Sequence, residues 1–201
     1  MPRVSKEQTE LNRHAIEDAS ARLFKEKGFA GVSVADLMGA AGLTHGGFYG
    51  HFASKDELAA VACANAFKHS AERWAKRIDE QPDEDAALQS IVDHYLSLRS
   101  LQDIGNACPG PSLGGDVARE DEAKPVRAAY RAGTAELVEI LATLAQGDAA
   151  ARRKTALAQW SLMVGAVMLA RATRGDPVSA EILAAARDHL LDKAPNTSPA
   201  R

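Results

Sequence analysis

The segment 42–55 carries several hydrogen-bond donors and no acidic side chain. Hydroxyl, imidazole and ammonium groups alternate there with glycines, and the donors are Thr44, His45, Tyr49, His51 and Lys55. Side chains of these types donate to phosphate oxygens, and those that reach base edges also read sequence. The formal net charge of the chain is −3, so any affinity for nucleic acid must come from such a local patch. The pattern therefore indicates a contact surface for DNA.

Taken one at a time, these side chains have ordinary structural explanations. Lone histidines such as His45 and His51 are more often solvated surface residues than functional ones, and Lys55 alone is a solvated lysine. Tyr49 alone is a core or rim aromatic. The functional interpretation therefore depends on the elements that position them.

Those elements are two short helices, expected at 34–41 and 45–51, with only a three-residue turn between them. Gly42 allows a sharp turn, Leu43 fills the angle between the helices, and Thr44 offers an N-cap for the second helix. A helix placed in this way stands out from the surface, and its N-terminal half can enter a major groove. The segment is a candidate helix-turn-helix.

The rest of the chain has helical spacing of apolar residues and no strand-length alternation, which predicts an all-α fold of about nine helices. The helices are expected at 9–27, 34–41, 45–51, 54–79, 84–101, 125–145, 149–173 and 178–193, with a loop or broken helix at 103–115. This predicts a helix-turn-helix domain at 1–53, a larger helical domain at 54–193 and a disordered tail at 194–201.

The N-terminal motifs, taken together, resemble the signature of the tetracycline-repressor (TetR-like) family. The resemblance covers about the first 60 residues and is carried by Ser33-Val34-Ala35-Asp36-Leu37-Met38, Ala41-Gly42-Leu43-Thr44, Gly47-Phe48-Tyr49-Gly50-His51-Phe52 and Ser54-Lys55-Asp56-Glu57-Leu58. It implies a DNA-binding domain followed by a helical domain for dimerisation and ligand binding. It also implies that DNA is contacted by Thr44, His45, Gly46, Gly47, Tyr49, His51 and Lys55, with Phe48 and Phe52 as core anchors.

One feature departs from the family pattern, because Gly50 stands where a long polar residue is common. With Gly46 and Gly47 it makes the recognition helix intrinsically weak, by up to about 1 kcal/mol for each glycine relative to alanine. The glycines either allow the backbone to approach DNA closely, or leave the helix to order fully on the operator. The N-terminal Arg3, Lys6 and Arg13 could add phosphate or minor-groove contacts.

A dimer is expected because a single helix-turn-helix of this size buries too little surface to bind DNA specifically. The helix 149–173 is apolar nearly all round and the last helix is its natural companion. The alternative is that both helices simply pack inside one subunit. The predicted interface residues are Trp160, Val164, Val167, Met168, Ile182, Leu183, Ala186 and Leu190.

A ligand pocket is expected in the larger domain, where aromatic residues and a few polar groups suit a small apolar or aromatic ligand. The alternative for each residue is an ordinary place in the core. The candidates are Phe67, Trp74, His94, Tyr95, Leu98, Cys108, Tyr130, Trp160 and Met163.

Cys108 precedes a proline in a loop that resembles one found in some of these regulators. A thiol at a helix N-terminus can have a lowered pKa and react with electrophiles or oxidants. The alternative is a small cysteine that packs in the loop.

Other classes of function lack support in the residues. Two cysteines and no metal-ligand or phosphate-loop spacing predict no cofactor, no metal and no enzyme, and the N-terminus has no apolar signal region. The longest apolar stretch, 162–170, is about half a bilayer span, so a cytoplasmic location is expected. A helical adaptor that lost DNA binding remains an alternative, and repressor and activator are not distinguished. We expect a homodimeric repressor, released from a palindromic operator by a small molecule or by an electrophile at Cys108.

Overall fold

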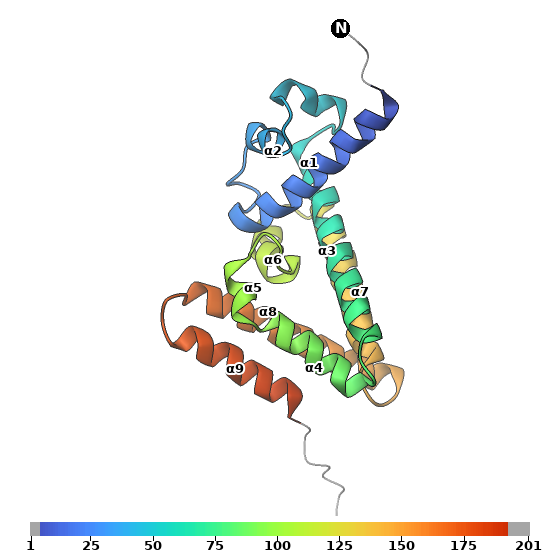
Figure 1. Ribbon diagram of the computed structural model, residues 1–201, viewed down its shortest axis with the longest axis vertical. Helices are drawn as coiled ribbons and strands as arrows, with labels where there is room; N and C mark the ends of the chain where they lie inside the picture. The colour runs from blue at the N-terminus through green and yellow to red at the C-terminus, as the bar shows by residue number, and fades with distance from the viewer. Residues whose placement is uncertain (1–4, 193–201) are drawn as a thin grey trace, which may run out of the picture.

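The computed structural model describes residues 5–192, and these form nine α-helices, one short 3-10 helix and no strand (Figure 1). The all-α fold predicted from the sequence is confirmed. The elements in chain order are α1 (Lys6–Lys27), α2 (Val34–Ala40), η1 (His45–Gly50), α3 (Lys55–Asp79), α4 (Glu84–Tyr95), α5 (Leu98–Gln102), α6 (Pro109–Arg119), α7 (Pro125–Thr143), α8 (Ala149–Ala172) and α9 (Val178–Leu191). The predicted tail, 194–201, lies outside the described residues.

Several helix ends differ from the predicted ones. Helix α1 begins three residues early, because the Ser5 side chain accepts a hydrogen bond from the backbone N–H of Gln8 and caps it there. The helix expected over 84–101 is interrupted, since Ser97 caps the separate helix α5. The segment predicted as a loop or broken helix becomes helical at Pro109, the first residue of α6, where proline needs no N–H donor.

The three N-terminal elements share a small apolar core of their own. Ile16 and Phe24 of α1 pack with Leu37 of α2 and Phe48 of η1, and all four side chains are almost completely buried. The Ser33 and Asp36 side chains form a capping box that starts α2, and Gly42 turns the chain with a φ of 72°. This core fixes the angle at which η1 lies on the surface.

The larger domain is built around the long helices α3 and α7, which run side by side away from the N-terminal elements (Figure 1). They approach closely because Gly133 of α7 has no side chain where the Phe67 ring of α3 lies. Helix α8 packs against α6, α7 and α9, which places α9 on the outside.

Helix α8 is long and apolar enough, by length and composition alone, to cross a membrane. The sequence prediction considered the stretch 162–170 too short, but alanines on its N-terminal side extend the apolar part of the helix. Here α8 is instead a packing element between its neighbours in the helical domain.

Candidate functional site

The predicted recognition segment lies on the surface of the N-terminal domain. Thr44, His45, Gly46 and Gly47 are exposed, and the Tyr49 side chain is 72% exposed. The segment forms a 3-10 helix instead of the expected α-helix, and Thr44 occupies its N-cap position without a side-chain hydrogen bond. Phe48 and Phe52 point into the core, as expected. Thr44, His45 and Tyr49 therefore face solvent, while the two phenylalanines hold the segment in place.

Two of the seven predicted DNA contacts are engaged within the chain. The Lys55 ammonium donates to the Phe29 carbonyl at 2.6 Å, and the side chain is half-buried. The His51 backbone carbonyl accepts from the Arg13 guanidinium, and His51 is also half-buried. Lys55 is thus engaged through its side chain and His51 through its backbone carbonyl alone. Within residues 5–192 the side chains of Thr44, His45, Tyr49 and His51 make no hydrogen bond to the rest of the chain.

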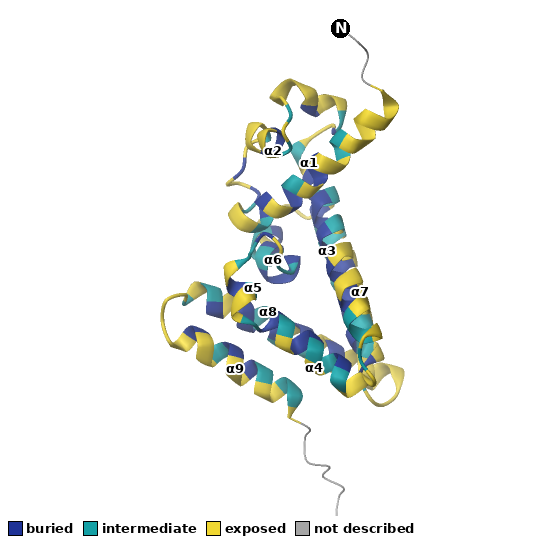
Figure 2. Ribbon diagram, viewed as in Figure 1, coloured by how far each residue is buried: buried dark blue, intermediate teal, exposed yellow. Residues whose placement is uncertain are grey.

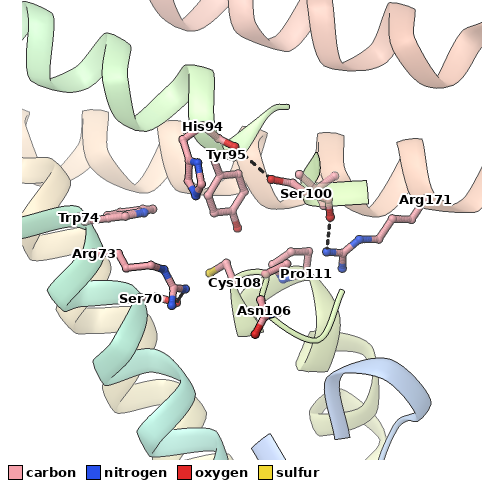
Figure 3. A pocket seen from close by; sticks show the side chains of 12 residues that line it. Ser70, Arg73, Trp74, His94, Tyr95, Ser100, Asn106, Cys108, Pro111 and Arg171 are labelled. Atoms are coloured by element: carbon pink, nitrogen blue, oxygen red, sulfur yellow. Dashed lines mark hydrogen bonds between the residues drawn. The ribbon is translucent and has the colours of Figure 1, made fainter. Parts of the chain in front are cut away.

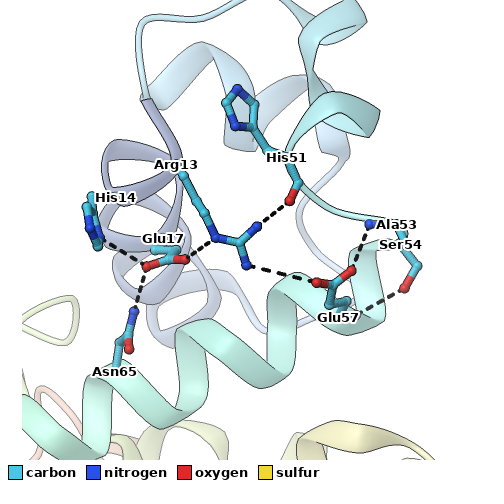
Figure 4. A network of polar contacts seen from close by, with 8 residues as sticks. All are labelled: Arg13, His14, Glu17, His51, Ala53, Ser54, Glu57 and Asn65. Atoms are coloured by element: carbon cyan, nitrogen blue, oxygen red, sulfur yellow. Dashed lines mark hydrogen bonds and ion pairs between the residues drawn. The ribbon is translucent and has the colours of Figure 1, made fainter. Parts of the chain in front are cut away.

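Arg13 was expected to supplement DNA contacts, but the structure places it in an internal polar network (Figure 4). Its Nε lies 3.1 Å from the buried Glu17 carboxylate, and its guanidinium lies 4.2 Å from the centre of the Phe52 ring. Glu17 also accepts from the Asn65 side-chain amide of α3 at 3.1 Å. The network thus joins α1 to α3. Lys6 is exposed on α1, and Arg3 lies outside the described residues.

The glycines of the recognition segment have room for a side chain. A Cβ at Gly46 or Gly50 would have no neighbour within 4 Å, and one at Gly47 would meet only the Met38 methyl at 3.6 Å. The packing of the domain therefore does not require glycine at these three positions.

A cavity opens in the larger domain between α3, α4, α6 and α8 (Figure 3). Four predicted pocket residues line it, namely Trp74, His94, Tyr95 and Cys108. Trp160 stacks edge-to-face behind Trp74 and Tyr95, with ring centroids about 6 Å apart. Ser70, which the sequence also suggests as a wall of the pocket, lines the cavity as well. The cavity is further lined by residues that the sequence did not suggest, namely Arg73, Ser100, Asn106, Pro111 and Arg171.

The remaining predicted pocket residues lie elsewhere. Leu98 of α5 is 61% exposed. Phe67 packs edge-to-face on Tyr130, and the Tyr130 hydroxyl donates to the Gly110 carbonyl at 2.8 Å. Met163 is buried in the core. For these residues the alternative of an ordinary core or surface position describes the structure better.

Cys108 does not have the lowered pKa expected at a helix N-terminus. Burial raises the pKa of the Cys108 thiol above its ordinary value, and this outweighs the opposing effects of the Gly110 N–H, Tyr95, Ser70 and Arg73. The second cysteine, Cys63, is buried in α3, which raises its pKa to about 12. Both thiols are therefore protonated at neutral pH.

The predicted interface residues divide into two groups. Trp160, Val167, Leu183 and Ala186 are buried within one chain, whereas Val164, Ile182 and Leu190 are half-buried and Met168 is 42% exposed. Leu157 and Leu169 of α8 and Val178 of α9 are also exposed. Figure 2 shows exposed residues along much of α9. Apolar side chains of α8 and α9 therefore remain exposed to solvent in the single chain.

Comparison with known proteins gives the same picture of the N-terminal domain. Residues 16–62 match the family model described as bacterial regulatory proteins, tetR family. The chain is 33% identical over 75 residues to the HTH-type transcriptional regulator CymR of Pseudomonas putida, a match covering 37% of each chain. The curated relatives are thus matched over about a third of their own length.

Solved structures match over nearly the whole chain. A TetR transcriptional regulator from Chloroflexus aurantiacus superposes with a TM-score of 0.74 at 27% identity, covering 92% of this chain and 94% of that one. The reduced form of NemR from E. coli has a TM-score of 0.76 at 19% identity, covering 89% of this chain and 94% of its own. The second similarity concerns the fold alone.

Proposed function

We infer from the membership of this chain in the tetR family of bacterial regulatory proteins that it is a homodimeric transcriptional repressor. The carrying observation is the helix-turn-helix within the matched residues 16–62, whose donor-bearing segment is exposed. In this proposal residues 1–53 bind a palindromic operator, and residues 54–193 dimerise and respond to a small molecule. The two recognition segments of the dimer read half-sites about one helical turn apart.

The proposed DNA contacts are mainly to phosphates. Tyr49 and Thr44 offer neutral hydroxyl donors, His45 an imidazole, and the glycines their backbone N–H groups. A gel shift or footprint on DNA upstream of the chain's own gene tests this. We expect a specific complex that weakens steeply with salt. Only weak, sequence-independent binding at low salt would contradict the proposal and would favour an adaptor.

Gly46→Ala tests why the recognition segment contains glycines. The new methyl group meets nothing within 4 Å, so we expect the free energy of unfolding to rise by up to about 1 kcal/mol. We expect operator affinity to fall, because the methyl group stands where the backbone approaches DNA. Chemical denaturation and gel shifts measure the two effects. Gly39→Ala on α2 also enters open space and is the matched control. A gain in operator affinity would show instead that the segment orders on DNA.

Met168→Glu tests the proposed dimer surface. Met168 is 42% exposed on α8, so the chain should fold with little change, while a carboxylate in an apolar interface should drive the dimer to monomers at micromolar concentration. Sedimentation velocity measures this. Leu11→Glu, at an exposed leucine of α1, is the control. An unaltered dimer would place the interface on another surface.

The relatives carry names of transcriptional regulators, which are not enzymes, and regulators of this family are soluble DNA-binding proteins. We extend both statements to this chain and propose that it has no catalytic activity and acts in the cytoplasm. Within residues 5–192 no group of three or more His, Cys, Asp or Glu side chains could hold a metal ion.

Release from the operator through reaction of an electrophile with Cys108 is the alternative mechanism. The raised pKa of the Cys108 thiol makes this mechanism less favourable. We expect slow alkylation of Cys108 by iodoacetamide at pH 7, with a rate that increases with pH and is still increasing above the ordinary pKa of a thiol, because only the thiolate reacts. Peptide mass spectrometry follows the modification, and Cys63 serves as an internal buried reference. Rapid, stoichiometric alkylation at pH 7 together with loss of operator release in Cys108→Ser would instead support the electrophile route.

A further inference from the structure

The cavity beside Cys108 has an inner and an outer part. The inner part is partly open to solvent and has a volume of about 30 Å³, close to the space that one water molecule needs. The outer part holds about 290 Å³ and shares Arg73, His94, Ser100 and Asn106 with the inner part. Together they form a small site, open to solvent at its outer part and here called the chamber, at the lower end of the size range of ligand sites.

Two arginines from different helices line the inner cavity without an acidic partner. Arg171 of α8 donates to the Ser112 hydroxyl and the Ser100 carbonyl, both at 2.9 Å, and its buried Nε has no hydrogen-bond partner. Arg73 of α3 donates to the Ser70 hydroxyl at 3.0 Å. In the part of the chain that the structure describes, neither guanidinium forms an ion pair. In Figure 3 they lie on opposite sides of Cys108.

The surroundings add to this excess of positive charge. Burial lowers the pKa of His94, and the nearby Arg77, Arg73 and Arg99 lower it further. Asp103 is the one carboxylate that lines the outer part within residues 5–192, and both of its oxygens accept from the Asn106 amide, at 2.9 and 3.1 Å. Arg171 is half-buried, and a guanidinium group that is half-buried without a counter-ion is costly, so an anion would offset that cost. Arg73 is exposed and lines both parts of the cavity.

Apolar and aromatic side chains also line the inner part. Trp74 and Tyr95 pack edge-to-face there, and Pro111 and Val167 complete the surface. The Tyr95 hydroxyl is buried beside the Cys108 thiol and makes no hydrogen bond of ordinary geometry. A ligand that fits has an anionic end toward the arginines and a flat apolar body against the rings.

We propose that this chamber binds a small organic anion, a monocarboxylate with a flat apolar body, and that Arg73 and Arg171 hold its charged end. The proposal deepens the proposed function, since such an anion is then the molecule that releases the operator. A cation would be repelled, and a neutral ligand would leave both guanidinium groups without a counter-charge.

The same loop that lines the chamber also touches the DNA-binding domain. The Ala107 carbonyl accepts from the Lys25 ammonium of α1 at 3.2 Å. Gly105 packs so closely on α1 that a Cβ there would lie 2.6 Å from Cγ of Arg22. An anion that displaces Asn106 and Ala107 therefore moves a direct support of α1, and this links the chamber to the recognition segment.

The first test uses the native full-length protein without DNA, titrated calorimetrically with benzoate, benzamide and benzamidine. These probes have nearly the same shape and carry a negative, no and a positive charge. We expect benzoate to bind at least about tenfold more tightly than benzamide, because charge-assisted hydrogen bonds to arginine are added. Hexanoate and inorganic phosphate show whether a flat body is needed. Three results would overturn the proposal. They are equal binding of benzoate and benzamide, tighter binding of benzamidine, and no binding of benzoate or hexanoate at millimolar concentration.

The second test assigns the charged end to the two arginines. Arg73→Gln and Arg171→Gln should each weaken benzoate binding by about tenfold and leave benzamide binding unchanged. Arg77→Gln, one helical turn from Arg73 and outside the lining, is the matched control. If Arg171→Gln does not fold, Arg171→Lys is used in its place, because lysine keeps the positive charge. Unchanged benzoate binding in folded variants of both arginines would overturn the assignment.

Measuring carboxylate binding and operator binding separately distinguishes the failure of this proposal from the failure of the proposed function. Charge-selective binding of benzoate without any operator complex would retain the anion site and refute the repressor. An operator complex in a protein that binds no carboxylate would do the reverse.

Discussion

Replacing Gly133 with alanine should lower the free energy of unfolding by about 1–3 kcal/mol, the usual cost of overpacking a core. Gly133 lies on α7 where that helix crosses the Phe67 side chain of α3. A new Cβ would overlap the Phe67 ring and would also lie 2.5 Å from the Phe67 Cβ, which no rotamer change can move. The backbones of α3 and α7 must therefore separate.

Urea denaturation of the purified chain measures this loss. Gly115→Ala is the matched control, since Gly115 is also inside a helix and a Cβ there would meet only Nη1 of Arg119, at 3.7 Å. That control should be neutral or more stable by up to about 1 kcal/mol, the gain in helix propensity. A Gly133→Ala variant as stable as the native chain would mean that α3 and α7 are less closely packed than described.

The N-terminal domain could be predicted closely because its signals are local. The capping box of Ser33 and Asp36 and the positive-φ Gly42 are set by neighbouring residues, and the structure contains each of them. The break after Tyr95 was missed because the apolar spacing continues through it without glycine or proline. The shift to a 3-10 helix at 45–50 follows from three glycines that weaken the α-helix, a preference that the spacing alone does not determine.

The pocket could be predicted only in its aromatic half. Trp74 and Tyr95 stand out in the sequence, but Arg73 and Arg171 look like any solvated arginine until α3 and α8 bring them to one cavity. The same limit applies to the interface, because an α8 that is apolar nearly all round does not show which face meets α7. Trp160 was therefore expected on the dimer surface, whereas it is buried with Trp74 and Tyr95.

The adjacent aromatic residues Phe48 and Tyr49 should respond in opposite ways when each is replaced with alanine. Phe48 is completely buried and packs against Phe52, with ring centroids 6.0 Å apart. Phe48→Ala should lower the free energy of unfolding by about 3–5 kcal/mol, which is most or all of the stability of so small a domain. We therefore expect 1–53 to lose its structure and operator binding to disappear, while the helical domain stays folded and dimeric.

Tyr49 presents its hydroxyl to solvent, and Tyr49→Ala should change the free energy of unfolding by no more than about 0.5 kcal/mol. Operator affinity should nevertheless fall by about tenfold to 100-fold, because one hydrogen bond to a charged phosphate contributes about 1.5–3 kcal/mol. Because a phenol carries no charge, the slope of affinity against salt concentration should stay the same. Tyr49→Phe separates the hydroxyl from the ring.

Hydrogen exchange and gel shifts distinguish the two variants. Phe48→Ala should lose amide protection throughout α1 and α2 and retain it in α3, α7 and α8, whereas Tyr49→Ala should retain protection everywhere. Because the two residues are neighbours in η1, this contrast separates loss of a DNA contact from loss of the domain that carries it. Native operator affinity in Tyr49→Ala would remove Tyr49 from the DNA surface. Native affinity in Phe48→Ala would mean that the operator itself supplies the order that the buried ring provides here.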